Sequence, residues 1–275
     1  MPLVTLKAAL DLAAEKNTFA IGFVCLGWED AQAYVAAGEA TGAPVILSAG
    51  PGARAHMPIH IWAEMFRYLA YKSSAPVVAH LDHGRSEEEC LRALTAGFSS
   101  VMFDGSALPL DENIRITQSV VEQARSQGAN VEAELGVVGY ADGAASAATS
   151  VQDVERFIDA VDIDALAISI GNVHLVTEGT VEIDWDSARA ISKACPKPLV
   201  IHGGSGVAWP DRTRLAQEFG VRKFNLGTEF RQEYGRSLRE ALQTDPTLYD
   251  PLQISQHPKA ALTSKAVSVL RECGW

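Results

Sequence analysis

The sequence predicts an α/β protein: a (β/α)8 TIM barrel with extra N-terminal and C-terminal helices. Eight short apolar runs alternate with amphipathic stretches along the 275 residues, a length that fits one such barrel. The runs are mostly apolar on both faces, which is typical of parallel strands covered by helices. Eight strands with eight following helices favour a closed barrel over an open doubly wound sheet, and no GxGxxG motif follows the first run.

Strands and helices are expected in strict alternation. The apolar runs predict strands near residues 19–25, 44–49, 76–82, 99–103, 130–135, 164–170, 198–202 and 221–226. The amphipathic stretches predict helices near residues 28–41, 58–73, 86–97, 111–127, 151–160, 185–195, 209–219 and 228–243. Two further helices are expected near residues 5–16 and 257–272.

Proline and glycine mark the boundaries of these elements. Pro44, Pro76 and Pro198 stand just before strands. Gly97 and Gly220 stand where helices should end, because glycine suits the left-handed conformation of a C-terminal cap. No shift in composition and no linker divides the chain, so we expect one barrel domain over residues 1–275.

The charge balance and the cysteines limit the possible partners and location. The net charge is −11, whereas nucleic acids and anionic membranes attract clustered Lys and Arg. No apolar run approaches the ~20 residues of a membrane-spanning helix, and the start does not resemble a signal peptide. The four cysteines are scattered without a CxxC pair, so we expect reduced thiols and a cytoplasmic protein.

Polar side chains gather at the carboxyl ends of the predicted strands, where barrel enzymes carry their active sites. His83 follows the third strand, His174 follows the sixth and His202 ends the seventh. Each alone could be an ordinary hydrogen-bonded residue at a strand end, but so many on one rim favour a site. Since three protein ligands leave a fourth position on a metal open, these histidines predict a catalytic metal site. Asp82 adds a carboxylate beside them.

Two glycine-rich segments follow the seventh and eighth strands, where barrels usually bind phosphate. They read His202-Gly203-Gly204-Ser205-Gly206 and Asn225-Leu226-Gly227-Thr228. Bare backbone N–H groups and two hydroxyls can hold a phosphate dianion there without many cations. The candidate phosphate-binding residues are Gly203, Ser205, Asn225, Gly227 and Thr228.

Six motifs stand in order along the chain: His80-Leu81-Asp82-His83-Gly84, Phe103-Asp104-Gly105-Ser106, Val131-Glu132-Ala133-Glu134-Leu135-Gly136, Ser169-Ile170-Gly171-Asn172-Val173-His174, Ile201-His202-Gly203-Gly204-Ser205-Gly206 and Lys223-Phe224-Asn225-Leu226-Gly227-Thr228. With these motifs the sequence resembles the class II, metal-dependent ketose-bisphosphate aldolases, which include the fructose- and tagatose-bisphosphate aldolases. The resemblance covers essentially the whole barrel.

The resemblance implies a metal centre. His83, His174 and His202 would hold Zn²⁺ or another divalent ion such as Co²⁺ or Mn²⁺, and Glu134 would stand behind them or serve as an alternative ligand. The ion would act as a Lewis acid on a ketose carbonyl and stabilise the enediolate. A nearby monovalent cation, Na⁺ or K⁺, is implied as well.

The resemblance also implies the proton transfers and the partners. Asp82 would move a proton at the hydroxyl that is formed or lost when the carbon–carbon bond is made or cleaved. The family's loop glutamate, which handles the enediolate proton, falls on Asp142 when counted from the Glu134-Leu135-Gly136 motif. The reaction would be reversible cleavage of a ketose or ketose phosphate into dihydroxyacetone or its phosphate and an aldehyde. The chain would act on a small sugar or sugar phosphate as a homodimer or homotetramer.

Three departures from the family pattern predict a divergent member with altered substrate scope. Phe23-Val24-Cys25-Leu26-Gly27 replaces a first-strand pattern rich in asparagine. Gly50 stands where a serine is usual, and Leu175 stands where a glycine usually follows the second zinc histidine.

Three alternatives remain open from the residues alone. A metal-dependent barrel hydrolase usually needs an HxH pair, whereas His80 and His83 are three positions apart. A non-catalytic partner of an aldolase would have no reason to keep the three histidines and Asp82. Schiff-base chemistry at Lys223 would leave the histidines unexplained.

Overall fold

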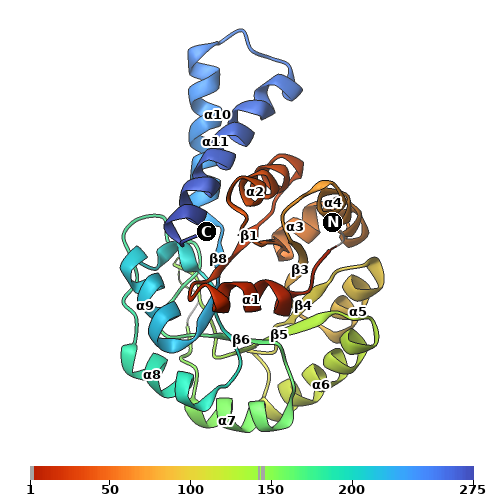
Figure 1. Cartoon of the computed structure of the whole chain (residues 1–275), viewed down its shortest axis with the longest axis vertical. Coiled ribbons are helices and arrows are strands. Elements are labelled where there is room, and N and C mark those ends of the chain that lie inside the picture. The colour runs from red at the N-terminus through yellow and green to blue at the C-terminus, as the bar shows by residue number, and fades with distance from the viewer. Residues whose placement is uncertain (1–2, 142, 144–145) are drawn as a thin grey trace.

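The structure, a computed structural model, describes residues 3–141, 143 and 146–275. Within these ranges, eight parallel strands close a barrel in chain order, which confirms the predicted fold class (Figure 1). The strands are β1 (Ala20–Val24), β2 (Val45–Ala49), β3 (Val77–Gly84), β4 (Ser100–Phe103), β5 (Asn130–Leu135), β6 (Ala165–Ile168), β7 (Leu199–Ile201) and β8 (Val221–Leu226). Each begins and ends close to its predicted bounds.

The helices surround the barrel as predicted, with two differences. They are α1 (Leu6–Glu15), α2 (Trp28–Thr41), α3 (Pro51–His56), α4 (Ile59–Lys72), α5 (Glu87–Ala96), α6 (Leu110–Ser126), α7 (Val151–Ala160), α8 (Trp185–Ala194), α9 (Trp209–Phe219), α10 (Thr228–Thr244) and α11 (Pro251–Glu272). The short helix α3 was not predicted. The predicted start of the last helix near residue 257 is wrong, because Asp250 caps a helix that opens with Pro251 and continues through Pro258.

Helix α1 closes the amino-terminal end of the barrel and lies across its opening in Figure 1. Its buried face packs against side chains that point into the barrel from the strands. The members of this cluster are Leu6, Ala9, Leu10, Ala13, Ala20, Ile46, Val78, Met102, Ala165, Ala167 and Val200. The barrel is therefore filled with apolar side chains at this end.

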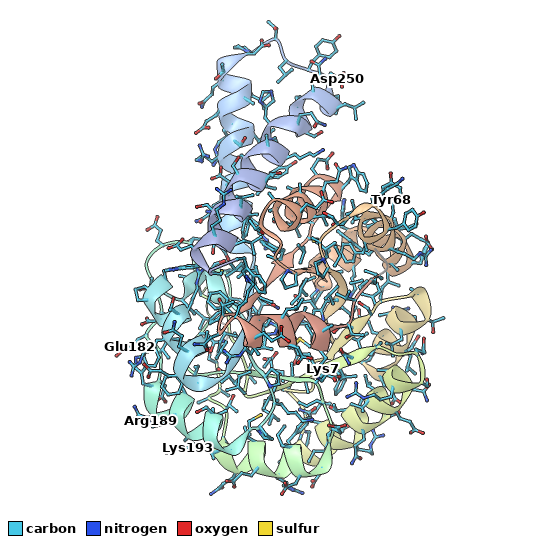
Figure 2. All side chains as sticks on the ribbon, in the orientation of Figure 1. Lys7, Tyr68, Glu182, Arg189, Lys193 and Asp250 are labelled. Carbon is cyan, nitrogen blue, oxygen red and sulfur yellow. The ribbon has the colours of Figure 1, made fainter. Side chains whose placement is uncertain are left out.

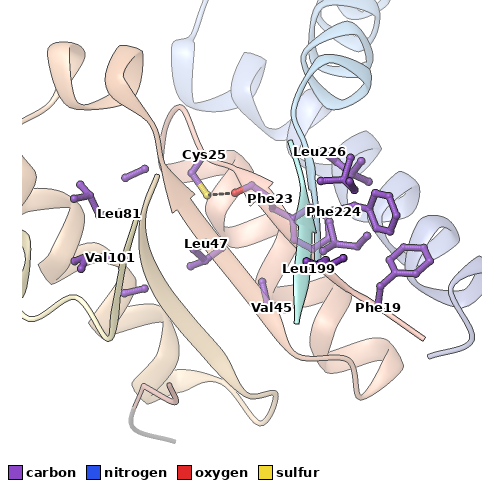
Figure 3. Packing of buried hydrophobic residues seen from close by; sticks show 14 of the residues in the cluster. Phe19, Phe23, Cys25, Val45, Leu47, Leu81, Val101, Leu199, Phe224 and Leu226 are labelled. Atoms are coloured by element: carbon purple, nitrogen blue, oxygen red, sulfur yellow. Dashed lines mark hydrogen bonds between the residues drawn. The ribbon is translucent and has the colours of Figure 1, made fainter. Parts of the chain in front are cut away.

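The alternate strand residues point outward and form a second, larger core beneath the helices. Figure 3 shows part of it, where Phe19 and Phe224 pack edge to face with ring centroids 4.6 Å apart. Each strand thus buries both faces, which explains why the runs lack the alternation of a half-exposed strand.

The surrounding helices bury one face only. On α8, Ala188 and Ile191 are buried, whereas Arg189 and Lys193 point away from the barrel (Figure 2). Helices α10 and α11 pack together and extend beyond the barrel (Figure 1). Within the described ranges, every helix is too short or too polar to span a lipid bilayer.

Candidate active site

A bulge in β3 brings two neighbouring polar residues to one site. The pairing with β4 runs from Leu81↔Val101 to Gly84↔Phe103, three steps on β3 against two on β4. One extra residue is therefore inserted in β3, and His83 adopts a left-handed φ of 50°. In a regular strand Asp82 and His83 would point to opposite faces, but here both side chains line one cavity of about 240 Å³. The bulge therefore brings His83 to the side of the strand that faces the cavity.

The three predicted histidines converge from different strand ends. The ring centroid of His83 lies 4.5 Å from that of His202 and 5.3 Å from that of His174. One nitrogen from each ring belongs to a set of atoms that all lie within 4.8 Å of one another. Three imidazole nitrogens at this spacing can share one metal ion.

Neighbouring carboxylates fix which nitrogens face the cavity. His83 Nδ1 lies 2.8 Å from Asp104 Oδ2, and His202 Nε2 lies 2.9 Å from Glu132 Oε1. His83 Nε2 is buried and has no hydrogen-bond partner within the described part of the chain. A buried nitrogen without a partner beside two more imidazoles is suited to a divalent ion, and a carboxylate on the opposite ring nitrogen is a usual support for a histidine ligand.

The charges around the histidines separate their pKa values. Burial lowers the pKa of His83, but the charge of Asp82 and the hydrogen bond to Asp104 outweigh it and raise that pKa to about 9. Burial and the charge of His83 lower the pKa of His174 to about 4. Burial also lowers the pKa of His202 well below its ordinary value. His83 is therefore the histidine of the three that holds a proton at neutral pH.

Asp82 is held as a carboxylate against the same histidines. Asn225 Nδ2 donates to Asp82 Oδ1 at 2.9 Å, and His202 Nδ1 lies 3.9 Å from that oxygen. Burial raises the pKa of Asp82, but the positive charges of His83 and Lys223 outweigh burial, so the pKa of Asp82 lies below its ordinary value. A buried, ionised carboxylate on a cavity wall can accept a proton from a bound hydroxyl.

Glu134 lies beside Nδ1 of His83, on the opposite side of the ring from the unpartnered Nε2. Its Oε2 is 3.6 Å from His83 Nδ1 and has no hydrogen-bond partner among the described residues. Glu134 belongs to a second possible ligand group, with His83 and Asp104. Burial raises its pKa to about 8, partly offset by the charge of His83. Its position fits an alternative ligand better than a member of the three-histidine set.

A buried polar layer lies beneath the cavity. Lys223 Nζ donates to Glu132 Oε2 at 2.7 Å and lies 3.3 Å from His80 Nε2, and His80 Nδ1 lies 2.9 Å from Ser100 Oγ. Lys223 is fully buried and its ammonium is already paired. A Schiff-base lysine needs a neutral amine open to substrate, so this arrangement argues against that alternative.

The five candidate phosphate-binding residues line the same cavity as the histidines. Ser205 Oγ accepts from the backbone N–H of Gly227 at 3.3 Å, which ties the two glycine-rich loops together. Gly203 has a φ of 64°, and an added Cβ would lie 2.1 Å from the carbonyl oxygen of Val173. Only glycine fits at that position, where the loop of His202 meets the loop of His174.

Tyr140 forms a wall of the cavity on the loop after β5. Its ring lies 5.0 Å from that of His174, and His174 N donates to Gly139 O at 2.8 Å. The predicted proton-transfer residue Asp142 follows closely on this loop but lies outside the described residues.

Some residues of the site were not assigned from sequence. Asp104 and Glu132 appear in the sequence analysis only as members of the ordered motifs, and their pairing with His83 and His202 depends on how the strands are staggered. Arg231, on the first turns of α10, also lines the cavity. Its position just after the Asn225–Thr228 segment is the feature of the sequence from which Arg231 could have been predicted as a site residue.

The fold and this cavity define a barrel enzyme whose ionisable side chains and possible metal ligands meet at the carboxyl ends of the strands. The family model for class II fructose-bisphosphate aldolase matches residues 4–275. The chain therefore belongs to the class II fructose-bisphosphate aldolase family and is an aldolase, a carbon–carbon lyase.

Relatives that match the full length of the chain are aldolases of the same family. The chain is 35% identical over 284 residues to the fructose-bisphosphate aldolase of Staphylococcus epidermidis, covering 100% of this chain and 98% of that protein. It is also 35% identical over 282 residues to the corresponding protein of Geobacillus stearothermophilus, with the same coverage. The solved structure of the YdjI aldolase from Escherichia coli K12 superposes with a TM-score of 0.87 at 28% identity, covering 99% of this chain and 97% of that one. The hydrolase and the non-catalytic partner are thereby disfavoured.

Proposed function

We propose that this protein is a divalent-metal-dependent aldolase that reversibly cleaves a ketose or ketose phosphate into dihydroxyacetone or its phosphate and an aldehyde. The observation that carries the proposal is the buried, unpartnered Nε2 of His83 beside His174 and His202. These three histidines would hold Zn²⁺, Co²⁺ or Mn²⁺. When bound, the ion supplies Lewis-acid stabilisation of the enediolate charge.

The protein's own groups divide the remaining work. Asp82 accepts the proton of the hydroxyl next to the breaking bond and returns it in the synthetic direction. Asn225 holds that carboxylate through its amide, 2.9 Å away. Asp142 is proposed to carry the enediolate proton. The Ser205 and Thr228 hydroxyls and the Arg231 guanidinium line the cavity and would bind an anionic end of the substrate.

We further propose that the substrate scope differs from that of a standard fructose-bisphosphate enzyme. Leu175 is 38% exposed on the cavity wall and holds a left-handed φ of 58°, a conformation that suits glycine. Gly50 leaves open the space next to Asp82, because an added Cβ would lie 3.3 Å from Asp82 Oδ2. Compared with the usual family pattern, Leu175 in place of a glycine narrows the cavity at one wall, and Gly50 in place of a serine widens it at another.

Solvent deuterium exchange tests the proposal without knowledge of the aldehyde. Metal-loaded protein is mixed in D₂O with dihydroxyacetone phosphate, and separately with dihydroxyacetone, and proton NMR follows the loss of the hydroxymethyl signal. We expect chelator-sensitive exchange into at least one donor, and exchange into the phosphate ester if its anion binds in the cavity. Absence of exchange into both donors would contradict the proposal.

A variant separates the two proton transfers. Asp82→Ala should keep the exchange reaction, because enediolate formation does not use that carboxylate, but it should lose cleavage and synthesis. Full aldol activity in Asp82→Ala would remove Asp82 from the mechanism.

A further inference from the structure

Arg54 on α3 is a buried cation directly behind the catalytic end of β3. Its side chain is 6% exposed, and its Nε pairs with Glu89 Oε1 at 2.8 Å. Nη1 donates to the carbonyl oxygen of Asp82 at 2.7 Å and to that of Ala49, and Nη2 donates to the carbonyl oxygen of His83 at 3.0 Å. Four of the five guanidinium N–H groups are therefore used within the protein, which leaves little capacity for a substrate anion.

The carbonyl groups that Arg54 binds lie where the strand ladder is interrupted. Strand β2 ends at Ala49, and the inserted residue in β3 lies between Leu81 and Gly84. Backbone carbonyls at such an interruption lose their partners in the neighbouring strand and need other donors when buried. Arg54 supplies donors to all three positions at once.

The bulge also has a conformational cost. His83 is not glycine, yet it has a φ of 50°. A left-handed conformation costs such a residue roughly 1–2 kcal/mol, so it persists only where surrounding contacts hold it. The guanidinium binds the carbonyl groups on both sides of that backbone turn, and Glu89 fixes the guanidinium in turn.

We infer that Arg54 is a positioning residue: it holds the bulge in the orientation that points Asp82 and His83 into the same cavity. This inference rests on the proposed roles of Asp82 and His83. Arg54 acts only through the main chain, and no contact with substrate is required. Loss of its carbonyl contacts would let the peptide planes rotate and misplace both side chains.

The test replaces Arg54 with lysine, which keeps the charge but cannot bind three carbonyl groups and Glu89 together. We expect Arg54→Lys to lower kcat at saturating metal about 10- to 100-fold and to weaken Zn²⁺ binding by a similar factor, the usual cost of losing an outer support of a ligand. KM for the ketose should change much less.

A matched control lies at the opposite end of the barrel. Arg125 Nη2 donates to the carbonyl oxygen of Asp162 at 3.0 Å and Nη1 to Asp164 Oδ2 at 2.7 Å. Arg125→Lys removes a carbonyl contact and weakens an ion pair at a partly exposed position away from the cavity, so it should lower thermal stability slightly without changing kcat or Zn²⁺ affinity. Equal kcat and Zn²⁺ affinity for Arg54→Lys and wild type would overturn the inference.

Two reactions of the same variant distinguish positioning from general damage. If Arg54 acts on cleavage through Asp82, then Arg54→Lys at saturating metal should lower kcat for cleavage about 10- to 100-fold but change the exchange rate less than about threefold, because exchange does not use Asp82. Equal losses in both reactions would contradict the positioning of Asp82. Should Arg54→Lys fail to fold, Arg54→Gln takes its place in the same comparison. A wild-type protein without aldol or exchange activity would instead overturn the proposed function.

Discussion

The two ends of the barrel are built from the same strands but filled with opposite kinds of side chain. At the amino-terminal end, α1 covers an apolar interior that includes Leu10, Ile46 and Val78. Two residues further along β3, the interior position belongs to His80, and two further to Asp82. The alternation of a strand thus carries one face from a sealed core to an ionisable site within a few residues.

Because of this difference, the stability of the fold should depend mainly on the amino-terminal end of the barrel and catalysis on the carboxyl end. Burying apolar side chains stabilises a fold, whereas burying charges costs free energy unless each charge is paired. The carboxyl end is paired accordingly, with Lys223 on Glu132 and Asp104 on His83, yet His83 Nε2 and Glu134 Oε2 stay unpartnered among the described residues. Substitutions at the two ends should therefore have different consequences.

The largest effect is expected from His202→Ala at the polar end. If His202 is a metal ligand as proposed, its removal should abolish stoichiometric Zn²⁺ binding and lower kcat/KM by about a thousandfold or more, since a Lewis acid contributes several kcal/mol to transition-state stabilisation. Metal analysis and steady-state kinetics measure both. His257→Ala, at an exposed position on α11, is the matched control. Activity that survives without metal would refute the Lewis-acid role.

At the apolar end, Leu10→Ala should do the reverse. Leu10 is 1% exposed in the apolar cluster beneath α1, so its truncation should lower the free energy of unfolding by about 3 kcal/mol while kcat stays within a factor of two. Chemical denaturation and kinetics provide the two readings. Leu12→Ala on the same helix, where the side chain is 37% exposed, should cost far less. A Leu10→Ala enzyme with normal stability would break the proposed division between the two ends.

The pH dependence of metal binding should reflect the release of one proton from the protein. The pKa of His83 is raised to about 9, whereas that of His174 is lowered to about 4, so only His83 must release a proton between these values when metal binds. Apparent Zn²⁺ affinity should therefore fall about tenfold for each unit of pH below 9. Competition with a fluorescent chelator at several pH values measures this slope.

Glu134 provides the control for that slope. Its pKa is raised to about 8, so a second proton would be released below that pH if its carboxylate were a ligand. We expect Glu134→Gln to leave the slope at one proton. A wild-type slope near two that falls to one in Glu134→Gln would instead make Glu134 a ligand.

The smallest effect is expected at the rim. Leu175→Gly removes side-chain bulk and relieves a left-handed φ of 58°, so preference for dihydroxyacetone phosphate over dihydroxyacetone should rise several-fold with little change in stability. Leu175→Ala keeps the strained backbone and removes most of the bulk, so it separates the two causes. Unchanged donor preference in both variants would show that Leu175 does not limit the phosphate site.

The sequence predicted the barrel because each strand is a short apolar run, and that pattern needs no knowledge of distant contacts. It also placed the three histidines on one rim, since parallel strand ends share an edge. It did not predict α3, whose six residues bury little apolar surface, or the bulge, which depends on register between β3 and β4. The pairing of Asp104 with His83 and the contacts of Arg54 follow from that register and were therefore hidden.

Gly203 has a consequence for how this enzyme can diversify. No side chain fits between its backbone and the carbonyl oxygen of Val173, so position 203 must remain glycine for the loops that carry His174 and His202 to keep this contact. Positions such as Gly50, Leu26 and Leu175 border the same cavity without that restriction. Substitutions at the mouth of the cavity can therefore change which substrate is accepted, while the spacing of the His174 and His202 imidazoles stays the same.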